Sequence, residues 1–553
     1  MSLPWLSDPR RPLTSPREIP KLEAWFDALD TSSMLTGAGA TITDGGSVAL
    51  WADKSGNSGV NCLCSPGANT TANSATLGAI GALGTSNFTV VARVSVSSYA
   101  SGTDLLLVGI GNGANAANLI AKNGTSRVQM SKATVGYVSA TNGSNLSAFT
   151  TYTVTYTKSG TTGTYYINGI ADGTCTDNFD YTANSGVVIG QFNTGVGSIV
   201  YQARVYSVAL DAAGVLADYN GTVQANCVLN IDFALSGKKL ANGDKFTCST
   251  GQEVTLNSSG ATGARIAGER DLFQGTAANR PVWLQYAGTK YAYFAGIAGF
   301  TVSVPLANDT YDVAITYKDA TTDTSTVVVG AGVAAFGGTD AKFASKMVTR
   351  IVVSKSSVAQ ATFDPSLYTS GTSFTSSDGK TWTINGGAHI VTRTGLYFDG
   401  SNDYLKSAAF SLSQPETVYF MGSQISWTNG DVMFDGGGAS NQAAIYQTGS
   451  SPNVAISSGV PLGTITTFAV QAFGMIASVF NGASSSVRHN RNAPATGNAG
   501  TQASNGLCIG SYTAGGSNAN CFVSEPVVYA SAHDIATQNR MALYAGRKWG
   551  FAS

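Results

Sequence analysis

Short apolar runs with a two-residue period recur along the chain from about residue 21 onward. "NFTVVARVSV", "TTYTVTYT" and "IVYQARVYSV" alternate β-branched or aromatic residues with polar ones, which is the pattern of a half-buried strand. Turns rich in Gly, Asn and Ser separate these runs at intervals of about ten residues, as in a β-sandwich. The pattern therefore predicts an all-β protein of the sandwich type.

Two segments, 210–221 and 533–550, have helical spacing instead. In the second, Asp534 is the expected N-cap, and Arg547 and Lys548 fall in the last turn. Each segment follows a similar strand, "ARVYSVALD" or "PVVYASAHD", and three further pairs match in the same order. These pairs are "TTYTV" with "TTFAV", "YYINGIA" with "SVFNGAS", and "VVIG" with "LCIG". The chain is therefore predicted to hold two copies of one fold.

The matches predict how the chain divides. Residues 1–20 form an extended arm, and residues 21–221 form a first sandwich closed by a short helix. Residues 361–553 form a second sandwich, also closed by a short helix. Residues 227–360, which have the same strand-rich texture but no closing helix, form a smaller β domain between the two sandwiches.

Composition excludes several classes of partner. Charged residues make up only 11% of the 553, and the net charge is −1, so no basic face for nucleic acid is expected. The N-terminus lacks the apolar region of a signal peptide, and no apolar run reaches the roughly 18 residues of a membrane span. The seven cysteines are sparse, odd in number and without a C-x-x-C, so we expect reduced thiols in a protein made in the cytosol.

The first twenty residues hold five of the fourteen prolines, which favour an extended or polyproline-like conformation. Two interpretations remain open, a frayed tail and an arm that docks on a partner protein. We favour the second, because tryptophan and arginine often anchor interfaces. The residues predicted to dock are Pro4, Trp5, Arg10, Arg11 and Arg17.

Several motifs, in their order, resemble those of concanavalin A-like jelly rolls of the laminin-G type. An opening W-x-D strand and a W-x-D-x-SGN element correspond to "AWFDALD" and "LWADKSGN", and an FDG-x-DY corner corresponds to "FDGSNDY". Strand pairs ending in Asn-Gly follow, and the last helix ends in Lys548-Trp549-Gly550. The opening is degraded in the second copy, where "TFDPSL" stands, and the corner is recognisable only there.

This version of the family resembles domains of structural proteins in tailed bacteriophages. The resemblance implies a virion protein, in first place a tail fibre or spike that attaches to the host through glycan-binding jelly rolls. A capsid decoration or head-fibre protein is the alternative, and a glycan-degrading enzyme is the least favoured reading. The expected partners are other virion proteins, through the arm, and a host surface glycan, and we expect a homo-oligomer.

Catalytic chemistry finds little support in the sequence. Glu269 and Asp271 form the one acidic pair at the strand spacing that a retaining glycosidase needs, but a solvated turn paired with Arg270 explains them. The sequence has three histidines but no serine in a G-x-S-x-G motif, so a serine hydrolase site is not expected. Two glycine-rich stretches, after residues 110 and 329, lack the helix that a dinucleotide site requires. We expect no enzyme activity.

Two loops have the chemistry of a sugar-binding surface, in which an aromatic ring stands beside amide or carboxylate groups. Buried tryptophans in a sandwich core are the alternative reading of both loops. The candidate ligand-binding residues are Trp382 and Asn385 in one loop, and Trp427, Asn429 and Asp431 in the other.

The FDG-x-DY corner is the one candidate metal site. Asp399, Asn402 and Asp403 could supply oxygen ligands to calcium, which jelly rolls of this type often hold in a loop. The favoured reading is a tight turn, because Gly tolerates positive φ and Asn and Asp bond their own backbone. No cofactor is expected apart from this calcium alternative.

Overall fold

The computed structural model describes most of the chain as strands connected by turns. Its described residues are 13–55, 61–65, 74–80, 83, 87–97, 104–111, 116–122, 125–132, 136–138, 143–181, 186–191, 198–257, 265–437, 442–512 and 516–552. Within these ranges the α-helices are α1 (Ala212–Tyr219) and α2 (Ile535–Trp549), both where the sequence predicts them. Neither helix is long and apolar enough to cross a membrane. The predicted class, all-β jelly-roll sandwiches closed by short helices, is confirmed.

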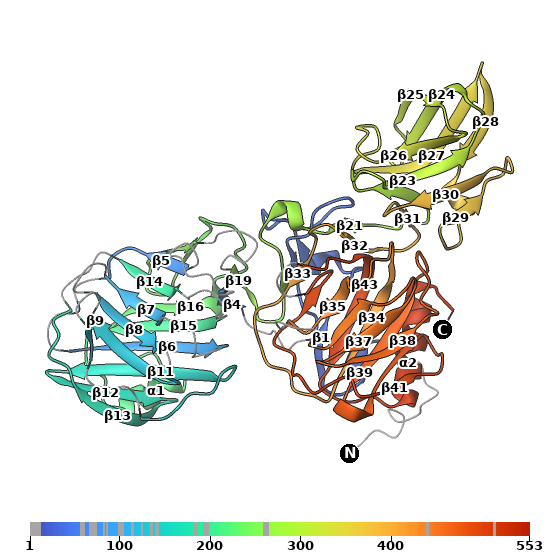
Figure 1. Ribbon diagram of the computed structural model, residues 1–553. Coiled ribbons are helices and arrows are strands. Elements are labelled where there is room, and N and C mark those ends of the chain that lie inside the picture. The colour runs from blue at the N-terminus through green and yellow to red at the C-terminus, as the bar shows by residue number, and fades with distance from the viewer. Residues whose placement is uncertain are drawn as a thin grey trace.

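The strands form three bodies, which Figure 1 shows as a first sandwich, a C-terminal sandwich and a small sandwich that projects from it. Each body packs two sheets around its own apolar core. We call the sheet that carries the helix in two of the bodies, together with its counterpart in the small sandwich, the main sheet, and the other the second sheet.

The first sandwich spans residues 61–268. Its main sheet runs in the order β13 (Ile170–Thr176), β12 (Thr162–Ile167), β11 (Thr151–Ser159), β6 (Asn87–Val96), β15 (Ser198–Tyr206), β4 (Asn61–Ser65) and β19 (Arg265–Gly268), and β16 (Cys227–Asp232) also pairs with β15. Its second sheet runs β10 (Gly136–Tyr137), β9 (Val128–Lys132), β8 (Ala117–Ala121), β7 (Leu105–Ile110), β14 (Val187–Gln191), β5 (Ser74–Leu77), β18 (Glu253–Asn257) and β17 (Lys245–Thr247).

The C-terminal sandwich gathers strands from three separate parts of the chain. Its main sheet runs β41 (Ala495–Gly497), β40 (Ser485–His489), β39 (Gly474–Phe480), β34 (Glu416–Gln424), β43 (Asn520–Tyr529), β32 (Gly395–Asp399) and β21 (Val282–Leu284), and β1 (Leu22–Trp25) also pairs with β43. Its second sheet runs β38 (Pro461–Ile465), β37 (Val454–Ser457), β36 (Ala444–Gln447), β35 (Val432–Asp435), β42 (Cys508–Ile509), β33 (Leu405–Lys406), β20 (Leu272–Phe273), β3 (Leu50–Trp51) and β2 (Met34–Leu35).

The small sandwich spans residues 291–391. Its main sheet runs β25 (Thr322–Val329), β24 (Asp309–Tyr317), β27 (Lys346–Lys355), β22 (Tyr291–Phe294) and β31 (His389–Val391), and β28 (Val358–Phe363) also pairs with β27. Its second sheet runs β26 (Val333–Gly337), β23 (Thr301–Pro305), β30 (Thr381–Asn385) and β29 (Ser373–Thr375).

All three sandwiches share one topology. The central strand of the main sheet pairs with three strands in each body: β15 with β6, β4 and β16; β43 with β34, β32 and β1; and β27 with β24, β22 and β28. The small sandwich is the same plan without the strands that correspond to β7–β10, β12 and β13, and without the closing helix. The repeat therefore has three copies, not two.

The opening motif recurs with the same turn in each copy. Asp27, Asp232 and Asp364 each accept a hydrogen bond from the backbone N–H two residues further on, at 3.1, 3.0 and 2.9 Å. The degraded motif "TFDPSL" thus keeps its turn, but it opens no C-terminal sandwich, because β28 pairs within the small one. One repeat match is wrong: residues 466–470, "TTFAV", do not form a strand, whereas their partner "TTYTV" enters β11.

Two of the sandwiches are inserted into hairpins of the third. The first sandwich leaves after β3 and returns at β20, which pairs with β3 (Trp51 opposite Leu272). The small sandwich leaves after β21 and returns at β32, which pairs with β21. Each insert also begins and ends on paired strands, β4 with β19 and β22 with β31. An insert with adjacent ends can enter a host loop without distorting it.

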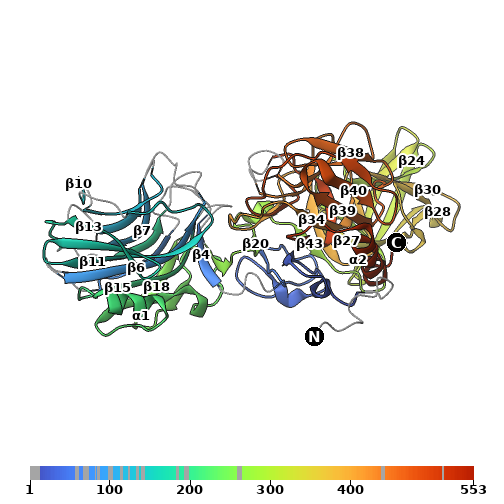
Figure 2. The ribbon, with the colours of Figure 1, turned by 90° about the horizontal axis from the view of Figure 1, so that it is seen from below.

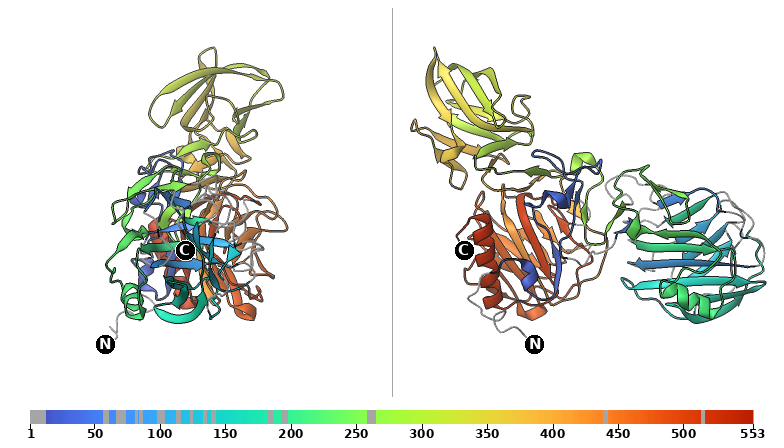
Figure 3. Two further views of the ribbon diagram at one scale, coloured as in Figure 1. Left: turned by 90° about the vertical axis from the view of Figure 1, so that its left-hand side faces the viewer. Right: turned by 180° about the vertical axis from the view of Figure 1, so that it is seen from behind.

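This nesting places the domain boundaries differently from those predicted at residues 20, 221, 227, 360 and 361. Residues 13–55 belong to the C-terminal sandwich, as Figure 3 shows for the blue N-terminal strand among the orange and red ones. Residues 227–268 complete the first sandwich, and residues 361–391 complete the small one. Within each predicted copy the matched segments follow one another along the chain. Strand pairing instead joins distant segments, such as Trp25 of β1 and Val527 of β43.

The three bodies differ in how the outer face of the main sheet, the face turned away from the second sheet, is covered. In the C-terminal sandwich α2 and residues 13–19 lie over it, and every residue of β34 is buried. The first sandwich has the shorter α1, seen beneath β15 in Figure 2, and β6 is buried except at Asn87 and Arg93. The small sandwich has no helix, and β24 alternates between buried and exposed residues.

The nesting predicts which pieces fold alone. Residues 13–55, 269–286 and 391–553, joined by two short turns in place of the inserts, should unfold cooperatively in urea, because all strands of the C-terminal sandwich are then present. Residues 361–553 alone should not, because β43 lacks β1 and the second sheet lacks β3 and β20. Circular dichroism during urea titration makes the comparison. A cooperative transition of residues 361–553 alone would contradict the nesting.

Candidate functional site

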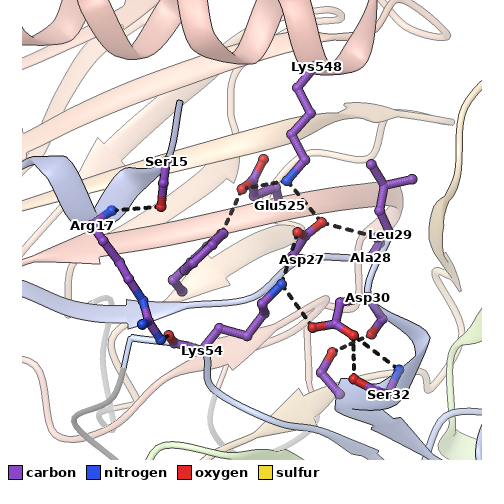
Figure 4. Close-up of polar contacts among 12 residues, drawn as sticks. Ser15, Arg17, Asp27, Ala28, Leu29, Asp30, Ser32, Lys54, Glu525 and Lys548 are labelled. Carbon is purple, nitrogen blue, oxygen red and sulfur yellow. Dashed lines mark hydrogen bonds and ion pairs between the residues drawn. The ribbon is translucent and has the colours of Figure 1, made fainter. Parts of the chain in front are cut away.

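The opening and closing motifs meet around one buried carboxylate in the C-terminal sandwich, Glu525 of β43 (Figure 4). The indole N–H of Trp25 donates to Glu525 Oε1 at 2.7 Å, and the indole N–H of Trp549 donates to Oε2 at 2.7 Å. The Tyr544 hydroxyl also donates to Oε1 at 2.7 Å. Glu525 therefore links β1, β43 and α2.

Two lysines complete this cluster. Lys548 Nζ lies 3.0 Å from Glu525 Oε1 and 3.0 Å from Asp27 Oδ1. Lys54 Nζ lies 3.2 Å from Asp27 Oδ2 and 2.9 Å from Asp30 Oδ2. Burial raises the pKa of Glu525 above its ordinary value, and the charge of Lys548 opposes that rise. The motif residues thus form a closed charge network that holds the fold.

Local structure sets the position of Lys548. The Asp534 side chain caps α2 by accepting from Thr537 N at 2.8 Å, and Gly550 ends the helix with a left-handed φ of 68°. Between these ends α2 lays Tyr544, Lys548 and Trp549 over β43. The helix therefore seals the outer face at Glu525.

In the first sandwich the equivalent position is open. Strand pairing aligns Gln202 with Glu525, and Asp232 with Asp27. Helix α1 has eight residues where α2 has fifteen, and it ends at Tyr219. A pocket of about 640 Å³ lies on the outer face beside it.

A row of four side chains crosses the pocket floor. Arg93 on β6 lies opposite Thr153 on β11 and opposite Gln202 on β15, and Gln202 lies opposite Asp232 on β16. The same row in the C-terminal sandwich is Met475, Met421, Glu525 and Asp27. Two apolar positions beneath α2 have thus become polar where the face is open.

Hydrogen bonds hold the pocket side chains in place. Gln202 Nε2 donates to Asp232 Oδ2 at 2.8 Å, and Arg204 donates from Nε to Asn230 Oδ1 at 3.0 Å. Arg204 also pairs with Asp218 Oδ2 at 3.1 Å and donates to Gln202 Oε1 at 3.2 Å. These contacts connect β15, β16 and α1, so the polar groups are fixed before any ligand arrives.

The rim of the pocket is apolar. Its exposed large side chains are Tyr219, Val223 and Leu235, with exposed fractions of 43%, 41% and 80%. A polar floor with an apolar rim suits a ligand that has both hydroxyl groups and carbon faces.

The pocket residues are absent from the candidates that the sequence suggests, but a signal for them exists. Arg93 interrupts the apolar run "NFTVVARVSV", and Arg204 interrupts "IVYQARVYSV". A charged residue in an otherwise buried strand marks a face that the fold leaves open or pairs internally.

One predicted sugar-binding pair is wrong. Trp382 is fully buried in the core of the small sandwich, between Phe336 and Phe363, and its indole N–H donates to Thr362 O at 3.0 Å. Asn385 bonds across the sheet to the hydroxyls of Thr301 and Ser303. Both residues are structural.

The second predicted loop joins β34 to β35, and each of its three residues contacts the turn at 447–453. Trp427 is half-buried and donates to Asn453 O at 3.0 Å, and Asn429 Oδ1 accepts from Gly449 N at 2.8 Å. Burial raises the pKa of Asp431 to about 6. The loop is tied to its neighbouring turn, and ligand binding there stays a prediction.

The FDG-x-DY corner has the geometry of a turn. Asp399 Oδ1 accepts from Ser401 N at 2.8 Å, and Asp403 Oδ2 accepts from Asp399 N at 3.1 Å. Asn402 is exposed, and Gly400 has a left-handed φ of 76°. Among the described residues no group of three His, Cys, Asp or Glu side chains is placed to hold a metal.

The predicted docking arm divides at residue 13. Pro4, Trp5, Arg10 and Arg11 lie outside the described residues. Residues 13–20 lie on the C-terminal sandwich, where Tyr529 OH donates to Pro16 O at 2.9 Å. The Arg17 guanidinium contacts Lys54 O and lies over Trp25, so Arg17 contributes to the cluster in Figure 4.

The acidic pair at residues 269 and 271 sits at a domain junction. Asp271 is buried, where the sequence suggests a solvated turn; it accepts from Asp53 N at 2.9 Å and pairs with Lys238 at 2.6 Å. Arg270 pairs with Glu269 and Glu23, as local ion pairing predicts. These contacts assign the pair a structural role.

Comparisons with known proteins give weak likenesses. No protein-family model and no curated protein matches the chain. Similar solved structures include a SAP-like pentraxin from Limulus polyphemus (15% identity, 36% of this chain, 95% of that chain, TM-score 0.25). A second is a carbohydrate binding module from Bacillus subtilis (10% identity, 21% of this chain, 71% of that chain, TM-score 0.17). A third is a Trypanosoma rangeli sialidase (15% identity, 38% of this chain, 35% of that chain, TM-score 0.20). At these values no neighbour's ligand can be transferred to this chain.

The charge network predicts the effect of removing Lys548. Lys548→Met leaves Glu525 and Asp27 without their shared cation and should lower the free energy of unfolding by about 3 kcal/mol at pH 7. The loss should shrink toward pH 4.5, because the pKa of buried Glu525 is raised above the ordinary 4.5, so the folded carboxyl is then mostly protonated and no longer needs the cation. Urea titrations at both pH values test this, with Arg547→Met on the exposed face of α2 as the matched control. Equal losses for the two variants would contradict the role of the network.

The corner predicts a pH-dependent gain for Asp403→Asn. Burial raises the pKa of Asp403 to about 8, against about 4 in an unfolded chain, so the protonated form stabilises the fold below pH 4 and this stability is lost as the pH rises to 8. Asn mimics the protonated acid, so its melting temperature should exceed that of the wild type at pH 7 but not at pH 4.

Thermal melts of Asp403→Asn, with Asn402→Ala as the control, measure this difference. Calcium should leave the wild-type melting temperature unchanged. A rise with calcium that Asp403→Asn abolishes would favour the calcium alternative at this corner.

Proposed function

We propose that this chain is a glycan-binding protein and that the open pocket of the first sandwich is its binding site. The observation that carries the proposal is the contrast between two equivalent faces. Tyr544, Lys548 and Trp549 fill the position in the C-terminal sandwich, whereas in the first sandwich the same position is an open pocket of about 640 Å³.

The side chains of the pocket support a saccharide as ligand. Asp232 and the amides of Gln202 and Asn230 offer several acceptors and donors on one floor, and hydroxyl groups use both. Tyr219 and Leu235 at the rim offer apolar surface for the carbon face of a sugar ring. Because the hydrogen bonds among these residues already fix them, little side-chain entropy would be lost on binding.

The same contacts favour binding over catalysis. Asp218 accepts from Arg204 and from the Tyr206 hydroxyl, and Asp232 accepts from Gln202 and from Ala234 N. Each carboxylate is therefore engaged as an acceptor within the fold. We propose that the protein holds its glycan without cleaving it.

The finer assignment rests on the motif resemblance. We propose a bacteriophage virion protein that attaches to the host cell, with capsid decoration as the alternative. The pocket supports attachment, because it lies on a sandwich that extends away from the body that holds residues 13–55 and α2 in Figure 1. In this proposal the first twelve residues contact another virion subunit, and the jelly rolls face the host.

Filling the pocket tests the proposed function. Asn230 occupies the position that Trp25 has in the C-terminal sandwich, so Asn230→Trp places an indole in the pocket and should abolish binding to a glycan array. Thr362→Trp, at the same position on β28 of the small sandwich, is the matched control and should bind as the wild type does. Circular dichroism verifies that both variants are folded. Unchanged glycan binding by a folded Asn230→Trp would contradict the proposal.

A further inference from the structure

Four charged side chains line the pocket, and Arg93 differs from the other three in its polar contacts. Arg204 pairs with Asp218, and Asp232 accepts from Gln202 and Ala234 N. Arg93 is exposed and has no ion pair or hydrogen bond to any described residue. It is therefore a cation on the pocket floor whose donors remain available to a ligand.

The position of Arg93 is fixed by a neighbouring ring. Its guanidinium lies over Tyr201 at 5.5 Å from the ring centroid, and the Tyr201 hydroxyl donates to Glu269 Oε2 at 2.8 Å. Beside this cation–π contact the N–H groups of Arg93 donate to no described residue, so they are available to a ligand. A guanidinium held in this way has the fork geometry that binds a carboxylate through two parallel hydrogen bonds.

Resting on the proposed function, we infer that the glycan bound in this pocket is acidic, with a sugar carboxylate on Arg93. Arg93 and Asp232 stand two strands apart in the row, roughly 10 Å at the usual strand spacing. An anionic group is therefore attracted at one end of the floor and repelled at the other. This polarity orients the ligand, with its carboxylate on β6 and its hydroxyls toward Gln202 and Asn230.

A pair of ligands that differ only in charge tests the inference. Oligogalacturonate is the acidic probe, and the same oligosaccharide with its carboxylates methyl-esterified is the neutral one. Calorimetric titration of the full chain at low salt should give at least about tenfold tighter binding of the free acid, which corresponds to one charge-assisted contact. Sulfated dextran oligosaccharides form a third arm, because sulfate lacks the planar match to guanidinium.

Variants connect the preference to Arg93. Arg93→Gln should weaken the affinity for the free acid by about tenfold or more and leave the affinity for the ester unchanged. Arg93→Lys should have an affinity for the acid between those of the wild type and Arg93→Gln, because lysine keeps the charge but lacks the two parallel donors of a guanidinium. Arg127→Gln removes a positive charge from the same sandwich outside the pocket, and it should change the affinity for neither ligand.

The outcomes separate this inference from the function it rests on. Equal binding of acid and ester, or a preference that Arg93→Gln leaves intact, overturns the acidic-glycan inference but leaves glycan binding in place. Binding of the sulfated probe alone overturns the carboxylate assignment. If no glycan in the array binds the folded protein, the proposed function fails and the inference fails with it.

Discussion

The carboxylate of Glu525 is the contact on which the C-terminal sandwich depends. It accepts indole N–H groups from both ends of the chain and lies against Lys548, so β1, β43 and α2 meet at one buried side chain. Burying a carboxylate is costly unless it is paired and hydrogen-bonded, and here the partners come from β1 and from α2. The outer face of the main sheet is sealed where this network exists and open where it does not, and the difference between the sandwiches follows from that.

The nested arrangement has a simple geometric basis. An insert must begin and end close together, and each inserted sandwich does so by placing its first and last strands side by side, β4 with β19 and β22 with β31. In the C-terminal sandwich the strand of the opening motif, β1, comes before the central strand β43. In each insert the equivalent strand comes after the central one, β16 after β15 and β28 after β27. The same topology thus accommodates two chain orders, and the hairpins of the host sandwich continue across both inserts.

Part of this could be predicted from the sequence, because it depends on local patterns. Two-residue alternation indicates strands, and Asp211 and Asp534 mark the starts of α1 and α2. Strand partners cannot be read in this way, since β1 pairs with β43 across some 500 residues that no local signal connects. For the same reason Trp382 resembled a surface aromatic, although its burial depends on Phe336 and Phe363 from other strands. Arg93 was visible as a charge in an apolar run, but the openness of its face depends on the length of α1.

Hydrogen–deuterium exchange of the full chain, with and without oligogalacturonate, tests the central claim most directly, because it reports where the glycan lies. The account predicts that ligand slows amide exchange in residues 202–206 and 216–232, which form the floor and rim of the pocket in the first sandwich. The equivalent segments of the C-terminal sandwich, sealed by α2, should exchange alike in both states. Slowed exchange confined to residues 426–431 and 447–453, around Trp427, would contradict the account and place the site in the C-terminal sandwich.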